Sequence, residues 1–134
     1  MYKYSITYDE ERNISITITD WGNYIELNPT INGILMIETD VLKKYKMHWR
    51  EAENYAKKLN KGGYSDWRLP TTDELKIIYK IKDCCGINSS LDFLWASEKP
   101  NDYSKGKWGL NFNDGTEVYC NNIKLGKGYV CCVR

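Results

Sequence analysis

Apolar and polar residues alternate along the first part of the chain, which predicts β-strands. Apolar side chains recur at every second position in residues 2–8 and 13–19, and this period of two is typical of strands that bury one face. The charged segment between them, residues 9–13, has the composition of a hairpin turn. The sequence therefore predicts an antiparallel hairpin at the start of the chain.

Two short apolar segments follow this hairpin. Residues 24–27 predict a third strand, and Asn28-Pro29 should end it, because proline restricts the backbone of the residue before it. Residues 34–37 form an apolar run that is typical of a buried strand. We expect residues 1–28 to form a small antiparallel sheet, either as an extension of the domain or as an edge of its main sheet.

In the middle of the chain the pattern becomes helical. Within residues 48–60, Trp49, Ala52, Ala56 and Leu59 fall on one stripe, and charged side chains fall on the opposite stripe. The sequence therefore predicts an amphipathic helix that buries this apolar stripe.

A second helix is predicted over residues 72–82, and the signals between the two helices are specific. Gly62-Gly63 should end the first helix, because glycine adopts the left-handed conformation of a C-terminal cap. Thr71 and Glu74 have the spacing of a capping box, which marks the start of the second helix.

The last third of the chain returns to strand patterns. Strands are predicted at residues 93–96, 108–112, 117–120 and 129–133, and Asn113-Asp114-Gly115 is a strong hairpin signal. The order is strands, two helices, then strands, with no linker or repeat, which predicts an α+β fold. The 134 residues are expected to form one domain.

The segment between the helices is too apolar for a passive loop. Trp67 and Leu69 are expected to insert into the core, while Arg68 between them pairs with a carboxylate, for which Glu74 is the best candidate. Asp66 is expected to cap or tighten the same turn. We call residues 64–71 the connector, and assign Trp67, Arg68 and Glu74 structural roles.

Composition and charge exclude some functions. Nineteen basic and eighteen acidic side chains give a net charge of +1, which argues against a nucleic-acid partner, because phosphate binding normally requires a basic excess. No apolar run approaches the length of a membrane span. The start of the chain has no signal-peptide pattern, so the expected locations are the cytoplasm, the outside of the cell after removal of a leader, or a phage particle.

The sequence contains five cysteines, an odd number: Cys84, Cys85, Cys120, Cys131 and Cys132. Their spacing does not fit a zinc site. Neighbouring strand residues point to opposite faces, so Cys131 and Cys132 should not both point inward. Buried free thiols are expected, because unpaired cysteine behaves as a small hydrophobic residue. We also expect a structural role for His48, no metal and no cofactor.

Several motifs together resemble a known family. The most specific is Asp66-Trp67-Arg68-Leu69-Pro70-Thr71 followed by Glu74-Leu75, and it is joined by segments 32–36, 93–97, 108–115 and 129–134. This set resembles the collagen-like-adhesin C-terminal domain family, whose fold is similar to the C-type lectin and formylglycine-generating-enzyme folds. The resemblance covers residues 32–134 and leaves residues 1–28 as an N-terminal extension.

The resemblance implies two helices packed on a twisted antiparallel sheet, with the first and last strands of the domain side by side. The chain departs from the family at Ala56, where a cysteine is common. That cysteine would lie opposite Cys132, so the bridge implied by the family cannot form here. Its loss favours a reducing compartment.

Lectins of this fold bind sugar through calcium. Glu98, Asn101, Asp102, Asn113 and Asp114 are similar to the calcium-binding pieces, and their oxygen ligands would suit the ion. However, a lysine interrupts the first motif, and the hairpin signal already explains the second. We therefore assign no metal site, and the sequence leaves open whether calcium binds near Glu98 and Asp114.

The resemblance also implies a ligand face on the loops between residues 97 and 128. Tyrosine, tryptophan, asparagine and lysine suit hydrogen bonding and stacking on sugars or on a protein partner; the alternative is ordinary surface loops. The candidate ligand-binding residues are Tyr103, Lys105, Lys107, Trp108, Tyr119, Asn121, Asn122 and Lys124.

The sequence thus predicts a non-enzymatic binding module for a carbohydrate or protein ligand. One alternative is an assembly domain of a phage or surface appendage, whose N-terminal strands dock a partner. Another is an oxidase related to the formylglycine generators, in which Cys120 with Cys131 or Cys132 would imitate a copper-binding pair. The sequence leaves the ligand, the oligomeric state and the compartment open.

Overall fold

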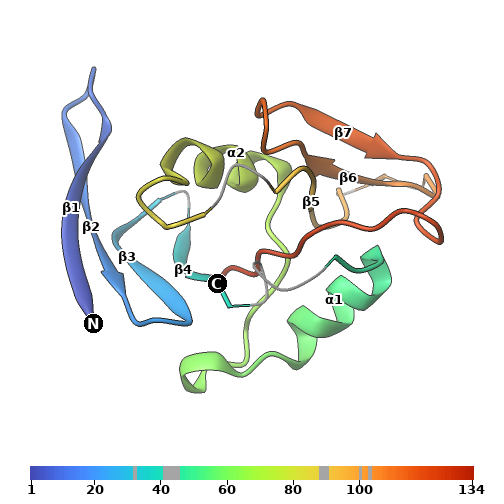
Figure 1. Ribbon diagram of the computed structural model, residues 1–134, viewed down its shortest axis with the longest axis horizontal. Coiled ribbons are helices and arrows are strands. Elements are labelled where there is room, and N and C mark those ends of the chain that lie inside the picture. The colour runs from blue at the N-terminus through green and yellow to red at the C-terminus, as the bar shows by residue number, and fades with distance from the viewer. Residues whose placement is uncertain (32, 41–45, 88–90, 100, 103) are drawn as a thin grey trace.

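Two antiparallel sheets and two α-helices form the part of the chain that the structure describes. The computed structural model describes residues 1–31, 33–40, 46–87, 91–99, 101–102 and 104–134. Its elements, in chain order, are β1 (Tyr2–Asp9), β2 (Ile14–Asp20), β3 (Tyr24–Ile31), β4 (Ile34–Glu38), α1 (Trp49–Lys58), the short 3₁₀ turn η2 (Lys61–Gly63), α2 (Thr72–Ile81), β5 (Leu94–Trp95), β6 (Lys107–Leu110) and β7 (Glu117–Cys120). The predicted α+β class is confirmed (Figure 1).

The first sheet contains the strands β1 to β4 in sequence order, each antiparallel to the next. The predicted hairpin is confirmed, with Ile16 and Ile18 buried on one face of β2. Asn13 closes the hairpin turn with φ of 54°, a left-handed conformation that asparagine tolerates. β4 connects this sheet to the rest of the molecule, so strands on both sides of the predicted boundary near residues 28–32 pair in one sheet.

β3 does not end at Asn28-Pro29, as the sequence predicted, but continues to Ile31. The pairing of β3 with β2 ends at Asn28, opposite Thr17, and the register of β3 with β4 shifts between Glu26 and Ile31. Pro29 therefore lies where it is paired with neither β2 nor β4, so the N–H group that proline lacks is not needed for a hydrogen bond between strands. This is the kind of position in which a strand accepts proline.

Both predicted helices are present, but Gly62 and Gly63 do not end α1. The helix stops at Lys58, and Leu59 already has an extended backbone. The two glycines lie beyond it in η2, with φ of 66° and 84°. Space also restricts Gly62, because a Cβ atom there would lie 3.0 Å from the Tyr24 hydroxyl. The glycines thus form a second turn before the connector.

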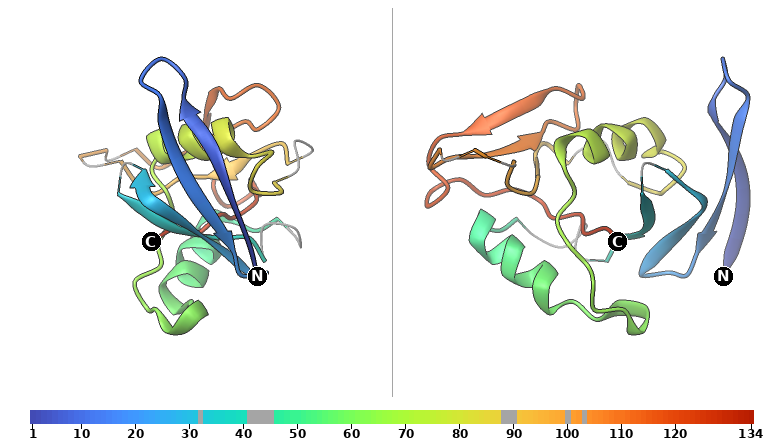
Figure 2. Two further views of the ribbon diagram at one scale, coloured as in Figure 1. Left: turned by 90° about the vertical axis from the view of Figure 1, so that its left-hand side faces the viewer. Right: turned by 180° about the vertical axis from the view of Figure 1, so that it is seen from behind.

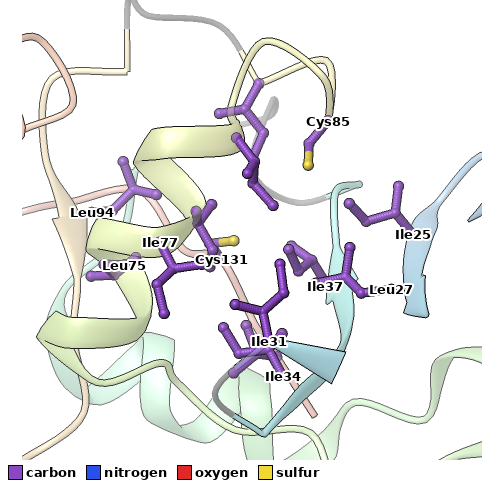
Figure 3. Packing of buried hydrophobic residues seen from close by; sticks show 14 of the residues in the cluster. Ile25, Leu27, Ile31, Ile34, Ile37, Leu75, Ile77, Cys85, Leu94 and Cys131 are labelled. Atoms are coloured by element: carbon purple, nitrogen blue, oxygen red, sulfur yellow. The ribbon is translucent and has the colours of Figure 1, made fainter. Parts of the chain in front are cut away.

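Two hydrophobic clusters hold the elements together. The α2 cluster lies between the first sheet and α2 (Figure 3), and the α1 cluster lies between α1, the connector and Trp95. The α2 cluster consists of Ile16, Ile18, Ile25, Leu27, Ile31, Ile34, Ile37, Leu75, Ile77, Ile78, Ile81, Cys85, Ile87, Leu91, Leu94, Ala96, Leu110, Phe112, Cys131 and Val133. The α1 cluster consists of Met36, Met47, Trp49, Ala52, Ala56, Trp67, Leu69, Trp95, Val130 and Cys132.

The C-terminal segment runs between these clusters. Residues 129–133 are extended, as predicted, but they form isolated bridges with β4, the connector and β5 instead of a regular ladder. Glu38 N donates to Cys132 O at 2.9 Å, and Arg68 and Val133 exchange two backbone hydrogen bonds of 2.9 Å. The last residues of the chain therefore lie beside β4, as the resemblance implied.

The second sheet contains β5, β6 and β7 and lies at the other end of the molecule (Figure 2). The predicted hairpin at residues 113–115 is confirmed, with Asn111 N donating to Thr116 O at 2.8 Å. The strands form two sheets instead of the single sheet that the resemblance implied, because only isolated bridges link β4 to β5 through the C-terminal segment. The C-type-lectin-like topology stays a prediction.

Candidate functional site

The connector has the inward arrangement that its composition suggested. Trp67 is 3% exposed and Leu69 is buried beside it in the α1 cluster. The Trp67 indole donates from Nε1 to Lys61 O at 3.1 Å and meets the Tyr24 ring edge-to-face at 6.2 Å between centroids. The indole therefore links η2 and β3 to the core.

Arg68 and Glu74 form an ion pair, with Arg68 Nη1 2.7 Å from Glu74 Oε1. Glu74 also accepts from Thr71 N at 2.8 Å, and Thr71 Oγ1 accepts from Glu74 N at 3.1 Å, which completes the capping box of α2. Burial favours a higher pKa for Glu74, but the hydrogen bonds from Arg68 and Thr71 outweigh it and lower the pKa below its ordinary value.

The sequence suggested that Asp66 caps or tightens the connector turn, but its carboxylate binds a residue outside that turn. Its carboxylate accepts from Arg134 Nε at 2.5 Å and from Arg134 Nη2 at 3.2 Å. The Arg134 guanidinium accordingly lowers the pKa of Asp66. The partner of Asp66 comes from the end of the chain, which no local pattern could show.

A groove of about 930 Å³, lined mostly by charged and amide side chains, lies at the N-terminal end of α1. Three parts of the fold meet there: the first turn of α1, the start of β6 with the residues before it, and the loop after β7. Its lining side chains, which define the ligand groove, belong to His48, Arg50, Glu51, Glu98, Ser104, Lys105, Lys107, Asn121, Asn122, Ile123 and Lys124.

Five of the eight candidate ligand-binding residues line this groove: Lys105, Lys107, Asn121, Asn122 and Lys124. Trp108 and Tyr119 do not; they oppose each other across β6 and β7, with ring centroids 5.1 Å apart. Strand alternation separates Trp108 from its neighbour Lys107. Tyr103 lies outside the described residues.

Lys107 is the most restrained cation of the groove. It is only 8% exposed, its Nζ lies 2.7 Å from Glu98 Oε1, and the same atom lies 4.7 Å from the centroid of the Trp49 ring. The Trp49 indole is itself fixed, because Nε1 donates to Ala96 O at 2.8 Å. A carboxylate and an aromatic face thus hold this ammonium group in place.

The rest of the lining is held by local hydrogen bonds. Asn122 Oδ1 accepts from Lys124 N at 3.1 Å, and Asp102 Oδ1 accepts from Ser104 N at 3.0 Å. His48 Nδ1 lies 3.0 Å from Gly126 O, which connects the start of α1 to the loop after β7. These bonds brace the loops, and the side chains of Lys105, Asn121 and Lys124 remain exposed to solvent.

Sequence reasoning missed the contribution of α1 to this groove. Arg50 and Glu51 fall on the polar stripe of the helix, which predicts exposure but no particular neighbour. His48 was assigned a structural role, and its hydrogen bond to Gly126 is consistent with that role. Only the packing of α1 against the C-terminal segment brings these residues to the loops.

The groove carries more positive than negative charge. Arg50, Lys105, Lys107 and Lys124 are four cations, against the two carboxylates Glu51 and Glu98. Glu98 is already paired with Lys107, and Glu51 Oε1 accepts from His48 N at 3.2 Å. The four cations outnumber the two carboxylates, and both carboxylates already accept a hydrogen bond, so the groove presents an excess of donors and of positive charge.

The carboxylates similar to lectin calcium ligands are already engaged. Glu98 pairs with Lys107, Asp102 accepts from Ser104, and Asp114 accepts from Thr116 N at 3.0 Å. Within the residues that the structure describes, no three His, Cys, Asp or Glu side chains are grouped to hold a metal ion.

The cysteines differ from the prediction at one point. Cys131 and Cys132 are both fully buried, because Cys131 joins the α2 cluster and Cys132 joins the α1 cluster. Adjacent residues do point to opposite faces, but both faces of this segment are covered. All five cysteines are free thiols, and Ala56 lies in the same cluster as Cys132.

Comparisons with known proteins place the chain in a family. Curated proteins give no significant match. Among the described residues, no helix has the length and apolar character needed to cross a membrane. The family model described as the Lcl C-terminal domain matches residues 17–134 and so extends further toward the N-terminus than residue 32. This chain belongs to the Lcl C-terminal domain family, the adhesin-associated family that its connector motif resembles.

Proposed function

We propose that the chain is a non-enzymatic ligand-binding module and that the ligand groove is its ligand face. The observation that carries the proposal is the meeting of Lys105, Lys107, Asn121, Asn122 and Lys124 with the first turn of α1. These residues come from elements far apart in the sequence. Concave sites with a few fixed polar groups are the usual places for ligands.

The chemistry of the lining favours a ligand rich in acceptor oxygens. Lysine and arginine donate only, and the asparagine amides donate as well as accept. Carboxylate or sulfate groups and hydroxyl oxygens of a carbohydrate would satisfy these donors, as would an acidic protein segment. Lys105 and Lys124, both exposed, would supply the uncompensated charge and adapt to the ligand, whereas the charge of the buried Lys107 is already balanced by Glu98.

A glycan array that includes neutral and acidic glycans, probed with and without calcium, tests this proposal. We expect calcium-independent binding that weakens as salt is raised, because the groove attracts anions through exposed charges. The double substitution Lys105→Ala/Lys124→Ala should reduce binding at least tenfold. A matched control, Lys3→Ala/Lys58→Ala, removes the same charge from exposed positions outside the groove. Equal binding by the two double variants would overturn the proposal.

A second candidate, an assembly domain, is favoured by the position of β1. This strand of eight residues is at the edge of the first sheet and pairs only with β2 in the sheet order. An open edge is a template for strand addition by a partner. Light scattering over a range of protein concentrations tests self-assembly: oligomers of wild type that Ser5→Pro abolishes would favour this alternative over a monomeric binding module.

The oxidase alternative is less favoured, because it requires a cysteine pair that shares one metal. Cys131 belongs to the α2 cluster, whereas Cys132 is fully buried in the α1 cluster, against which the half-buried Cys120 at the end of β7 packs. Cys120 with Cys132 is therefore the pair to test. Mass spectrometry of the protein incubated with Cu(I) tests this alternative. A stoichiometric copper adduct lost in Cys120→Ser would revive it.

A further inference from the structure

Aromatic side chains form a row on the surface near the C-terminal end of α1, away from the ligand groove. The Trp21 and Tyr24 rings stack with centroids 6.5 Å apart and planes 26° apart. Gly62 lies between Tyr24 and Tyr64, because a Cβ atom there would be 3.0 Å from the Tyr24 hydroxyl and 3.2 Å from Tyr64 Cδ2. We name Trp21, Tyr24 and Tyr64 the aromatic row.

Trp21 lies in the β2–β3 turn, Tyr24 is the first residue of β3, and Tyr64 directly follows η2; Gly62 of η2 brings the two parts of the chain together, because it lies against both tyrosine rings. Figure 1 shows η2 near the β2–β3 turn. Trp21 is 47% exposed and Tyr64 is 38% exposed, whereas Tyr24 is half-buried between them. Tyr24 also meets the buried Trp67 ring edge-to-face. The row is therefore anchored in the α1 cluster and held ready for a ligand, which reduces the entropy lost on binding.

Charged groups flank the row. The Arg134 guanidinium lies 3.8 Å from the centroid of the Tyr64 ring and is bound to the exposed carboxylate of Asp66. At the other end, Trp21 Nε1 donates to Glu26 Oε1 at 3.1 Å. Each carboxylate has about four acceptor sites, so these bonds leave acceptors available beside the aromatic faces.

The size of the exposed aromatic surface helps to identify its occupant. A fully exposed tryptophan or tyrosine side chain presents roughly 150–250 Å², so the two exposed rings offer about 200 Å². A standard protein interface buries about 800 Å² on each partner. The row is therefore too small to be a stable protein interface by itself, but it matches one or two sugar rings.

We propose that the aromatic row is a second binding surface that takes the rings of a neutral oligosaccharide. The apolar face of a pyranose ring would pack on Trp21 and on the part of the Tyr64 ring that Arg134 leaves exposed. Its hydroxyl groups would donate to Glu26 and Asp66 and accept from Arg134. Aromatic rings flanked by polar groups suit such a ligand, which is apolar on its ring faces and polar on its rim. This inference does not rest on the ligand groove.

A nitrogen-15 NMR titration with cellohexaose, maltohexaose, chitohexaose and mannohexaose tests the proposal. The Trp21 indole N–H resonance can be assigned by its absence in Trp21→Ala. At millimolar sugar concentration, at least one of the four should shift this resonance and the amide resonances of Gly62 and Gly63. Trp21→Ala and Tyr64→Ala should each weaken the affinity, followed at Gly63, at least tenfold.

Two controls separate this surface from the groove. Val118→Ala truncates another exposed apolar residue, and Lys105→Ala/Lys124→Ala alters the groove; both should leave the affinity unchanged. Circular dichroism checks that each variant folds. The proposal is overturned if no sugar of the panel shifts the Trp21 resonance, or if Trp21→Ala binds as wild type does. It is also overturned if protein concentration alone shifts this resonance, because a second copy of the chain would then occupy the row.

Discussion

Arg68 and Glu74 bind each other through two parallel hydrogen bonds, of 2.7 Å from Nη1 to Oε1 and 2.8 Å from Nη2 to Oε2. The same carboxylate accepts from Thr71 N, and the backbone of Arg68 pairs with Val133. One buried carboxylate thus joins the connector to the start of α2, and the connector in turn is joined to the C-terminal segment. Bidentate geometry adds directional precision to the charge interaction.

The first prediction concerns the stability that this carboxylate provides. In Glu74→Gln the side chain keeps its shape but loses its charge. The amide has one acceptor oxygen, whereas Arg68 and Thr71 donate to two oxygens of the carboxylate. We expect a loss of about 1–3 kcal/mol in the free energy of unfolding, below the usual cost of breaking a buried pair because Arg68 is half-exposed. Urea denaturation measures it. Glu53→Gln, which breaks an exposed helical pair with Lys57, should cost about 0.5 kcal/mol or less. Equal losses in the two variants would contradict the prediction.

The second prediction concerns acid. The pKa of Glu74 is lower in the folded protein than its ordinary value of about 4.3. The stability that this shift provides is therefore fully present above about pH 4.3 and is lost as the pH falls through the lower, folded value. Glu74→Gln should remove this contribution, so the difference in unfolding free energy between wild type and variant should be constant near pH 7 and shrink below pH 4. A difference that grows on acidification would show the opposite sign.

Local signals in the sequence were sufficient where the structure depends on near neighbours. The capping box at Thr71 and Glu74, the hairpin at residues 113–115 and the apolar stripe of α1 lie within a few residues, and all three are present. The inward arrangement of Trp67 was also predictable, because few exposed loops would place an indole beside a leucine.

The predictions that failed depend on distant contacts. Pro29 is accepted inside β3 because the β4 register shifts there, and Gly62 and Gly63 form a turn packed on Tyr24 instead of capping α1. Cys131 and Cys132 are both buried because a second core covers the other face of their segment. Only part of the ligand groove could be predicted, for the same reason. Its loops could be located because they lie next to predicted strands, but the contribution of α1 depends on tertiary packing.

The third prediction concerns thiol reactivity. Cys85, Cys131 and Cys132 are buried, and burial raises the pKa of the Cys85 thiol to about 12 and also raises that of Cys131 and Cys132. Because the thiolate is the reactive form, iodoacetamide should modify the partly exposed Cys84 and Cys120 in the native protein, and the other three only on unfolding. Peptide mass spectrometry, with a guanidinium-denatured sample as control, identifies the sites. Native modification of Cys131 or Cys132 as fast as that of Cys84 would contradict the assigned burial.

The last prediction uses a glycine at the centre of the second sheet. A Cβ atom at Gly109 would overlap the carbonyl oxygen of Leu94 and the Phe93 ring, and the backbone oxygen cannot rotate away. Gly109→Ala should therefore push β5 from β6 and cost about 3 kcal/mol or more. Gly86→Ala is the matched control: its φ is +68° and no atom lies within 4 Å of the added carbon, so only backbone strain of about 1–2 kcal/mol is expected. Urea denaturation of both variants separates crowding from backbone strain, and a Gly109→Ala protein as stable as Gly86→Ala would show that β5 and β6 are less closely packed than described.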